Sequence, residues 1–206
     1  MLQRGQIQEI RRKLSLFPVV VLLGPRQCGK TTLAQSLGGR YYDMETEGSR
    51  ARLDAEWNDA ANGKELIIID EAQEAPEVFK RLRGTIDANR KQNGRYLLLG
   101  SVSPNLISEV SESLAGRTGF IEMSPLSLTE VAGSKMDSLW LYGGYPDGGV
   151  LDATPYPDWQ NAYLAALTSS DLPKWGLTAS AQMSKRLLQM LATHHGQPLN
   201  ASQLGQ

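Results

Sequence analysis

The sequence predicts an α/β protein built on a mainly parallel, five-stranded sheet. Five short apolar runs alternate with helix-like segments over roughly the first 130 residues. Three of the runs, at 19–23, 66–70 and 96–99, are almost continuously aliphatic, as in strands that are buried on both faces of a parallel sheet. Alternation of strands and helices favours parallel pairing because each crossover helix packs back onto the sheet.

The segments between these runs have helical features. Ile7, Ile10 and Leu14 recur at intervals of three and four residues, which predicts an amphipathic helix ahead of the first strand. Pro76 suits the first turn of a later helix, whose inner stripe begins with Val78. In chain order, we expect helix 6–15, strand 19–23, helix 32–37, strand 40–43, helix 47–61, strand 66–70, a helix from 76, strand 96–99, helix 104–114 and strand 120–123.

A phosphate-binding pattern follows the first strand. Residues 24–31 match the P-loop spelling G-x-x-x-x-G-K-T/S, in which glycines let the backbone curl around an anion and point its N–H groups inward. We expect Lys30 to reach the β- and γ-phosphates and the Thr31 hydroxyl to bind Mg²⁺. The helix that begins there directs the positive end of its dipole at the same anion. The residues expected to form the nucleotide site are Gly24, Pro25, Arg26, Gln27, Cys28, Gly29, Lys30, Thr31 and Thr32.

Two acidic residues end the third strand. Asp70 closes a buried run, where a carboxylate is costly unless it pairs with a cation. Mg²⁺ shared by Asp70, Thr31 and phosphate oxygens would supply that cation. Glu71 comes next, placed to orient or deprotonate the water that attacks the γ-phosphate. Acids at strand ends are also common helix caps, but a pair that follows a P-loop by one strand–helix–strand excursion is far more specific. Three branched residues followed by Asp70 and Glu71 favour ATP hydrolysis over simple binding.

Ser101, Arg117 and Cys28 each have a functional and a structural interpretation. Ser101 could touch the γ-phosphate or the attacking water, or could cap the helix after Pro104. Arg117 lies before the fifth strand, away from the nucleotide edge, so it is either an arginine finger for a neighbouring subunit or a solvated arginine. Cys28 lies near a helix N-terminus that would lower its pKa, which allows redox control, but a small side chain that fills the loop is the simpler reading.

Composition limits the partners. The counts of 21 Lys and Arg against 22 Asp and Glu create no overall field, so binding to nucleic acid or membrane is not implied. A basic series from Lys80 to Arg95 could be a partner or nucleic-acid patch, although a solvated helix face explains it more simply. The single cysteine fits a reducing compartment, so we expect a cytoplasmic location. No apolar stretch approaches the ~20 residues of a membrane span.

The composition changes after Glu130. Ser127-x-x-Glu130 is a capping box for one short helix, and residues 133–157 are rich in glycine, proline and aromatic residues. Two helices and the first turn of a third are expected beyond. Because an isolated helical turn is not stable, we expect the chain to be a fragment of a longer protein. The predicted division is a P-loop domain over 1–132, a connector over 133–157 and a helical segment over 158–206.

Several ordered motifs carry a family resemblance. They are Gly24-Pro25-Arg26-Gln27-x-Gly29-Lys30-Thr31-Thr32, Asp70-Glu71-x-Gln73-x-x-Pro76, Leu99-Gly100-Ser101, Ser113-Leu114-Ala115-Gly116-Arg117, Pro125-Leu126-Ser127 and Gly143-Gly144-Tyr145-Pro146. From about residue 17 to the end, the chain resembles prokaryotic AAA+-superfamily ATPases that carry an uncharacterised C-terminal domain. The resemblance implies strand order 5-1-4-3-2, Asp70 and Glu71 as the Walker B pair, Ser101 as sensor and Arg117 as the finger candidate. It also implies a winged-helix-like region that opens near 180–206.

The combined expectation is an ATPase that binds and hydrolyses MgATP, with Lys30, Thr31, Asp70 and Glu71 in the central roles. An Arg117 that acts in trans would require a homo-oligomer, and the protein partner that the ATPase serves is unknown. One alternative is a nucleotide-gated binding module, in which ATP occupancy sets the shape of the C-terminal region and turnover is incidental. Another is a DNA-associated ATPase, which rests on the winged-helix-like tail and the basic series.

Overall fold

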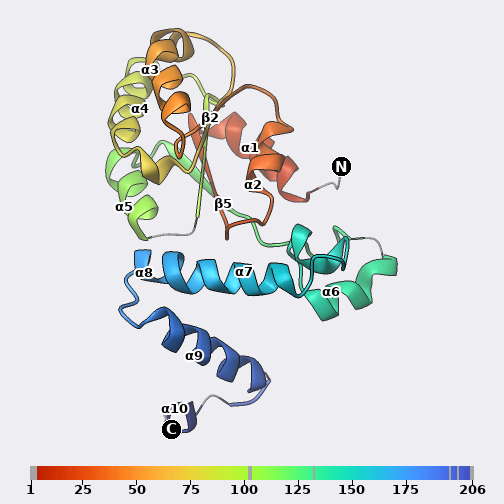
Figure 1. Ribbon diagram of the computed structural model, residues 1–206. Coiled ribbons are helices and arrows are strands. Elements are labelled where there is room, and N and C mark those ends of the chain that lie inside the picture. The colour runs from red at the N-terminus through yellow and green to blue at the C-terminus, as the bar shows by residue number, and fades with distance from the viewer. Residues whose placement is uncertain (1–3, 102–103, 132, 195, 199, 205–206) are drawn as a thin grey trace. The chain divides into compact units, whose positions relative to one another are not determined.

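The structure of the protein is a computed structural model that describes residues 4–101, 104–131, 133–194, 196–198 and 200–204 (Figure 1). Contacts divide the chain into two compact units, Met1–Ala153 and Thr154–Gln206. The first unit contains the sheet and the P-loop, and the second is helical. The predicted α/β class is confirmed by the five-stranded parallel sheet.

The strands pair in the order β2-β3-β4-β1-β5, and every pair is parallel. Their bounds are β1 (Val19–Leu23), β2 (Arg40–Asp43), β3 (Ile67–Asp70), β4 (Tyr96–Gly100) and β5 (Thr118–Glu122). This is the predicted order 5-1-4-3-2 read from the other edge, so that prediction is confirmed. All residues of β1, β3 and β4 are buried because these strands have a neighbour on each side and helices on each face.

Helices cover both faces of the sheet (Figure 1). The odd-numbered side chains of β1 share a core with α3 (Glu47–Asn62), α4 (Glu77–Ala88) and α5 (Pro104–Ser113). The even-numbered ones, Val20 and Leu22, pack with α1 (Gln6–Leu16) and α2 (Lys30–Gln35). The division follows from the two-residue period of a strand, which points successive side chains to opposite faces. A short 3₁₀ turn, η1 (Ala72–Glu74), links β3 to α4.

The capping box after β5 forms, but without the predicted helix. The Ser127 N–H donates to Glu130 Oε2 at 2.9 Å, and residues 128–130 are a turn that does not continue. The other carboxylate oxygen accepts the Gly5 N–H at 3.0 Å, so Glu130 ties the N-terminal segment to this turn. The expectation of a short helix here is therefore wrong, since the capping box closes a single turn over residues 128–130.

Residues 133–153 fold back onto the end of β5. They form a 3₁₀ turn η2 (Gly133–Lys135), helix α6 (Met136–Tyr142) and a π-type turn η3 (Pro146–Val150). The Leu126 N–H donates to Gly144 O at 2.7 Å, and a Cβ on Gly144 would lie 2.2 Å from Leu126 O. Glycine is therefore needed at 144 for this close approach. The contacts place residues 133–153 with the first unit, whereas the predicted connector extended to residue 157.

The second unit consists of helices and short helical turns. They are α7 (Asp158–Ala166), η4 (Leu167–Asp171), α8 (Leu172–Lys174), α9 (Ala181–Thr193) and α10 (Ala201–Leu204). The Ser180 hydroxyl oxygen caps α9 by accepting the Met183 N–H, and Asn200 Oδ1 accepts the Ser202 N–H at the start of α10. None of the helices in the described part of the chain has the length and apolar character that a membrane crossing requires.

Two adjacent glycines lie in the turn that leads into β2, and substitutions there test how this turn packs. Gly38 and Gly39 both have positive φ, 76° and 110°, so alanine is strained at either. A Cβ on Gly39 would lie 2.3 Å from Leu66 O, whereas one on Gly38 would meet nothing within 4 Å. We expect Gly38→Ala to lower the free energy of unfolding by about 1 kcal/mol and Gly39→Ala by about 3 kcal/mol or more. Urea denaturation measures both, and equal losses would contradict this packing.

Candidate nucleotide-binding site

The loop between β1 and α2 has the curled backbone of an anion nest. Gln27 and Gly29 both adopt left-handed conformations, with φ of 60° and 98°. Such residues within a turn direct neighbouring N–H groups toward one point. Gly24 packs against the chain that leaves β5, where a Cβ would lie 2.4 Å from Met123 O. A side chain at position 24 would therefore push the loop off the sheet.

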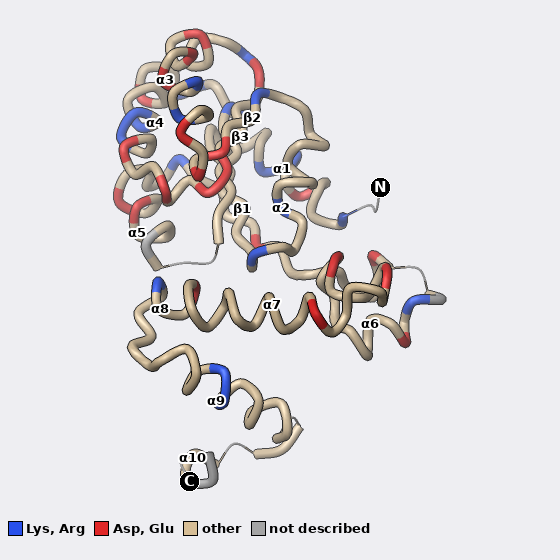
Figure 2. Tube along the Cα trace, in the orientation of Figure 1, with Lys and Arg blue, Asp and Glu red and all other residues tan. Residues whose placement is uncertain are grey.

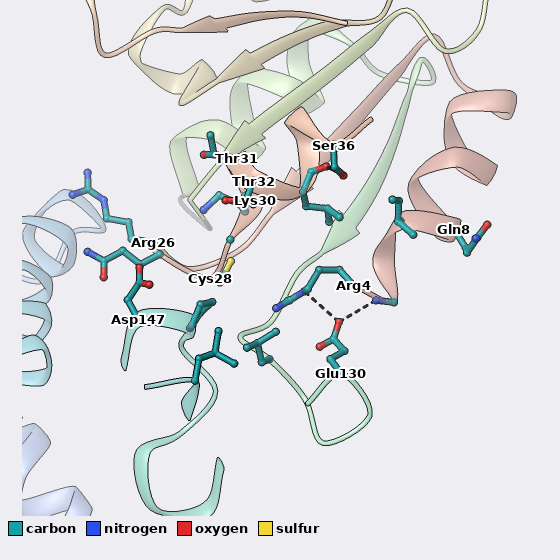
Figure 3. A pocket seen from close by; sticks show the side chains of 18 of the residues that line it. Arg4, Gln8, Arg26, Cys28, Lys30, Thr31, Thr32, Ser36, Glu130 and Asp147 are labelled. Carbon is teal, nitrogen blue, oxygen red and sulfur yellow. Dashed lines mark hydrogen bonds and ion pairs between the residues drawn. The ribbon is translucent and has the colours of Figure 1, made fainter. Parts of the chain in front are cut away.

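A cavity of about 1180 Å³ opens in front of this loop (Figure 3). It is large enough for a nucleotide, since ligand pockets commonly measure a few hundred to ~1,000 Å³. Its walls include the following residues predicted from the sequence: Arg26, Gln27, Cys28, Gly29, Lys30, Thr31, Thr32 and Glu71. Gly24 and Pro25 lie at the base of the loop and contribute carbonyl groups to it.

Lys30 is held by its own loop. Its side chain is buried, and Nζ donates to Gly24 O at 2.9 Å and to Pro25 O at 3.0 Å. An ammonium group has three donors, so these two bonds leave one for a ligand in the cavity. Because Lys30 begins α2, its charge adds to the positive end of that helix dipole. The site is therefore electropositive where the P-loop pattern expects phosphate.

Asp70 lies directly beside the start of α2. It is 4% exposed, and its Oδ2 accepts hydrogen bonds from Thr31 Oγ1 at 2.6 Å and from the Tyr41 hydroxyl at 2.8 Å. Thr31 Oγ1 and the Asp70 carboxylate are hard oxygen ligands, and Mg²⁺ is normally held by one or two carboxylates together with phosphate oxygens. The donor set therefore fits magnesium, which Thr31 and Asp70 would hold.

Tyr41 is a site residue that the sequence reasoning missed. It lies on β2, in register with Ile68 of β3, and its hydroxyl reaches across to the carboxylate at the end of β3. Burial raises the pKa of Tyr41, and its hydrogen bond to Asp70 raises it further, so the hydroxyl stays protonated and donates. Only the strand order could have indicated it, because nothing in the local sequence links residue 41 to residue 70.

Glu71 faces the cavity from a strained backbone. Its φ and ψ are both 48°, a left-handed conformation that is uncommon for residues other than glycine. Its carboxylate accepts a hydrogen bond from Gln73 Nε2. Burial raises the pKa of the Glu71 carboxyl, while the Gln73 amide and the charge of Lys30 oppose that rise. The structure thus brings Lys30, Thr31, Asp70 and Glu71 together.

Ser101 lies at the same edge of the sheet. It follows Gly100, which pairs with Leu23 at the entrance to the P-loop. Ser101 is 8% exposed, and its hydroxyl oxygen has no hydrogen-bond partner among the described residues. A buried hydroxyl without a partner does not act as the helix cap that was the alternative. Its role as a sensor remains a prediction.

Arg117 lies at the opposite end of the strands from the P-loop. It precedes β5, and the parallel strands put it at the end away from the P-loop. Its guanidinium binds Asp87 through Nε at 2.9 Å and through Nη2 at 2.6 Å. These hydrogen bonds, together with the charge of Arg117, lower the pKa of the Asp87 carboxyl. Arg117 therefore cannot reach the nucleotide site of its own chain, and only a role in trans is compatible with the finger hypothesis.

Cys28 does not have the environment expected of a reactive thiol. It is fully buried, and Sγ lies 3.7 Å from Met123 O. Burial raises the pKa of the Cys28 thiol, and this outweighs the lowering by the charges of Lys30 and Arg4. The expected lowering of this pKa by the helix N-terminus is therefore wrong. The alternative, a small side chain that fills the loop, agrees with the packing.

The far wall of the cavity comes from segments that the sequence did not assign to the site. Figure 3 shows Arg4 and Glu130 on one side of the loop and Asp147 on the other. The Arg4 guanidinium donates to Ser124 O at 2.5 Å and pairs with Glu130, 3.2 Å from Nε to Oε1. These residues belong to the N-terminal segment and to the chain beyond β5, which meet only in the folded protein. No local motif signals them.

The basic series from Lys80 to Arg95 is partly neutralised by neighbouring carboxylates. Figure 2 shows Asp and Glu interspersed with these basic residues on α3 and α4. Arg81 pairs with Asp54 of α3, and Arg83 and Arg90 pair with Asp87. Arg95 is buried and donates to Ala60 O at 2.7 Å. Lys80 and Lys91 are exposed to solvent, so the series combines paired, buried and solvated charges, which agrees better with a solvated helix face than with a patch for nucleic acid.

Together, the loop, the sheet edge and the cavity define a P-loop nucleotide-binding protein of the AAA type. Family models agree: one described as an AAA domain matches residues 16–132, and one described as Domain of unknown function (DUF8612) matches residues 133–206. The first covers more than half of the chain and contains the P-loop and the two acids. The chain therefore belongs to the AAA domain family.

Two curated relatives match nearly the whole of this chain in sequence. The chain is 37% identical over 209 residues to the uncharacterized proteins Rv2008c of Mycobacterium tuberculosis and Mb2031c of Mycobacterium bovis. Each match covers 98% of this chain and 47% of the relative. The chain thus spans about half the length of these relatives.

Solved structures give a matching fold. The Walker-type ATPase PABY2304 of Pyrococcus abyssi has a TM-score of 0.54 and 14% identity, with 94% of this chain and 73% of that chain covered. The signal transduction ATPase with numerous domains PH0952 of Pyrococcus horikoshii has a TM-score of 0.51 and 14% identity. That match covers 91% of this chain and 37% of PH0952. At this identity the likeness shows the fold alone.

The burial of Cys28 can be checked by its reactivity. Because the thiol is buried and its pKa is raised, a thiol reagent should modify the native protein far more slowly than the denatured protein at pH 7. Absorbance after addition of Ellman's reagent measures the rate, with Cys28→Ala as the blank. Native and denatured protein that react equally fast would show that the thiol is accessible.

Proposed function

We propose that this protein binds MgATP and hydrolyses it to ADP and phosphate. One observation carries the proposal: Lys30, Thr31 and Glu71 line one cavity, and the buried Asp70 carboxylate accepts the Thr31 hydroxyl directly behind it. A binding site for phosphate alone needs the loop and the lysine. The added pair of acids is what hydrolysis requires, one for the metal and one for the water.

Each residue then has a distinct task. The N–H groups of the loop and Lys30 hold the β- and γ-phosphates, and Thr31 and Asp70 hold Mg²⁺. The metal, when bound, neutralises charge that builds up on the phosphate oxygens. Glu71 orients a water molecule and accepts its proton as the water oxygen bonds to the γ-phosphorus. The bond from that phosphorus to the bridging oxygen breaks, and its electron pair leaves with ADP.

Tyr41 and Ser101 support these tasks. The Tyr41 hydroxyl donates to the same Asp70 oxygen as Thr31, so it fixes the carboxylate on the side of the metal site. The unpartnered Ser101 hydroxyl can donate to the γ-phosphate or to the attacking water from the end of β4. Both assignments follow from position at the sheet edge where ligands of parallel α/β proteins bind.

Arg117 enters the proposal only through an assembly. As a finger it would contact the γ-phosphate of a second copy of the chain, which requires a homo-oligomer. To do so its guanidinium would have to exchange Asp87 for phosphate or use the donors that Asp87 leaves free. A structural role, in which Arg117 joins the start of β5 to the end of α4, is the competing explanation.

Two substitutions test the central roles. Lys30→Ala should weaken ATP binding on the order of 100-fold, because it removes a charge-assisted bond to phosphate in a buried site. Glu71→Gln should keep ATP affinity within about 2-fold and lower kcat by roughly 10²- to 10⁴-fold. Calorimetry with ATP and a phosphate-release assay measure these effects. Lys64→Ala, an exposed lysine outside the cavity, is the matched control and should change neither.

The same assays separate hydrolysis from the alternatives. Tight ATP binding with negligible phosphate release, even at high protein concentration, would favour a nucleotide-gated module instead. Stimulation by DNA with a steep salt dependence would favour the DNA-associated reading. Turnover by Glu71→Gln at the parent rate would show that the role given to Glu71 is wrong.

A pair of variants separates the two roles of Arg117. Arg117→Ala and Asp87→Asn both break the ion pair between these residues, and Asp87→Asn also weakens the pairs with Arg83 and Arg90, so a purely structural role predicts lower thermal stability in both variants and similar turnover. A finger predicts that only Arg117→Ala loses turnover, by roughly 10³-fold or more, because Asp87→Asn leaves the guanidinium in place. Turnover should be measured over a range of protein concentrations. Equal turnover in the two variants would end the finger hypothesis.

A further inference from the structure

We propose that Gln73 is a positioning residue that orients the carboxylate of Glu71 for hydrolysis. This inference rests on the proposed function and gives a role to a residue that the proposed function does not use. Gln73 lies in η1, two residues after Glu71, and its Nε2 donates to Glu71 Oε2. A carboxylate only accepts hydrogen bonds, so the nitrogen end of the amide must face it. One carboxylate oxygen is thereby held, and Oε1 remains for the attacking water.

The backbone between the two residues enforces this pairing. Glu71 adopts the left-handed conformation, its N–H donates to Asp70 Oδ1 at 3.0 Å, and its carbonyl accepts the Glu74 N–H at 2.9 Å. The turn is thus held on both sides of Glu71. Strained backbone of this kind persists where the surrounding structure over-determines it, and such sites are frequently functional. Here the turn brings the amide of Gln73 back onto the Glu71 side chain.

The other end of the amide argues against a purely structural role. Gln73 Oε1 is buried and has no hydrogen-bond partner among the described residues. Leaving a buried acceptor unpaired is destabilising, so fold stability alone does not account for a glutamine at this position. A contact whose benefit lies in holding Glu71 does account for it. The unpaired oxygen lowers the stability of the fold, and the proposed role of Gln73 in hydrolysis explains why it is nevertheless present.

The end of β4 is shaped to admit this side chain. A Cβ on Gly100 would lie 2.6 Å from Gln73 Oε1 and 2.3 Å from Leu106 Cδ2. Gly100 has an ordinary φ, so the space that glycine leaves, rather than its backbone freedom, is what the site uses. Gly100 also pairs with Leu23 at the entrance to the P-loop. Gln73 therefore connects Glu71 to the strand end beside the phosphate loop.

Two substitutions at position 73 test the proposal. Gln73→Met keeps the length of the side chain and removes the donor, and Gln73→Glu keeps the shape and places a carboxylate against Glu71. We expect kcat to fall on the order of 10- to 100-fold in both, because a misplaced catalytic group costs up to that much, with the Kd for ATP unchanged within about 2-fold. Gln35→Met, an exposed glutamine on α2, is the matched control and should keep the parent kcat.

A double-mutant cycle with Glu71 distinguishes positioning from general damage. In a Glu71→Gln background, Gln73→Met should change turnover by no more than about 2-fold, because the group it positions no longer acts as a base. Full additivity, or a parallel loss of ATP affinity, would overturn the proposal. So would a kcat within twofold of the parent in both single variants. Circular dichroism confirms that each variant is folded. If Gln73→Met does not fold, Gln73→Glu takes its place in the cycle.

A readout that needs no turnover separates this inference from the proposed function. In protein labelled with ¹³C at the glutamate carboxyl, the Glu71 signal is assigned by its loss in Glu71→Gln. We expect that signal to shift in Gln73→Met at constant pH and to stay unchanged in Gln35→Met. A parent protein that binds ATP without hydrolysing it would refute the proposed function. An unchanged Glu71 signal in Gln73→Met would refute the contact itself.

Discussion

The hydrogen bond from Thr31 Oγ1 to Asp70 Oδ2 joins the first turn of α2 to the last residue of β3. It can form only because β1, β3 and β4 run parallel, with their carboxyl ends at one edge. The P-loop leaves β1 at that edge, the acids leave β3 and Ser101 leaves β4. The residues proposed to hold the phosphates, the metal and the attacking water all depend on this arrangement. An antiparallel strand at the position of β3 would carry Asp70 to the other side of the molecule.

The site departs from the rules that the rest of the fold obeys. Lys30, Asp70 and Ser101 are polar and buried, although most side chains around them are aliphatic. Gln27 and Glu71 adopt left-handed backbone without being glycine. Lys30 and Asp70 are stabilised by hydrogen bonds, whereas Ser101 and Gln73 each retain an unpaired buried atom. Local inconsistencies of this kind are expected where a structure serves a ligand rather than its own stability.

Two ways of dividing the chain give different boundaries, for a physical reason. The family models meet between residues 132 and 133, whereas contacts divide the chain after Ala153. The hydrogen bond between Leu126 and Gly144 and the close approach at Gly144 fold the intervening segment onto the end of β5. Pro146 and Asp147 consequently line the cavity in front of the P-loop. A segment that belongs to one domain by sequence thus belongs to the other by packing.

The sequence alone determined the α/β class, the five strands, the P-loop and the acids after β3, because each depends on local spacing and hydrophobic periodicity. The tertiary structure decided what depends on proximity between distant segments. The hydroxyl of Tyr41 on Asp70, the Arg4–Glu130 wall, the burial of Cys28 and the ion pair that holds Arg117 are all of this kind. A local pattern specifies which side chains an element presents, but only the order and register of the strands specify what those side chains meet.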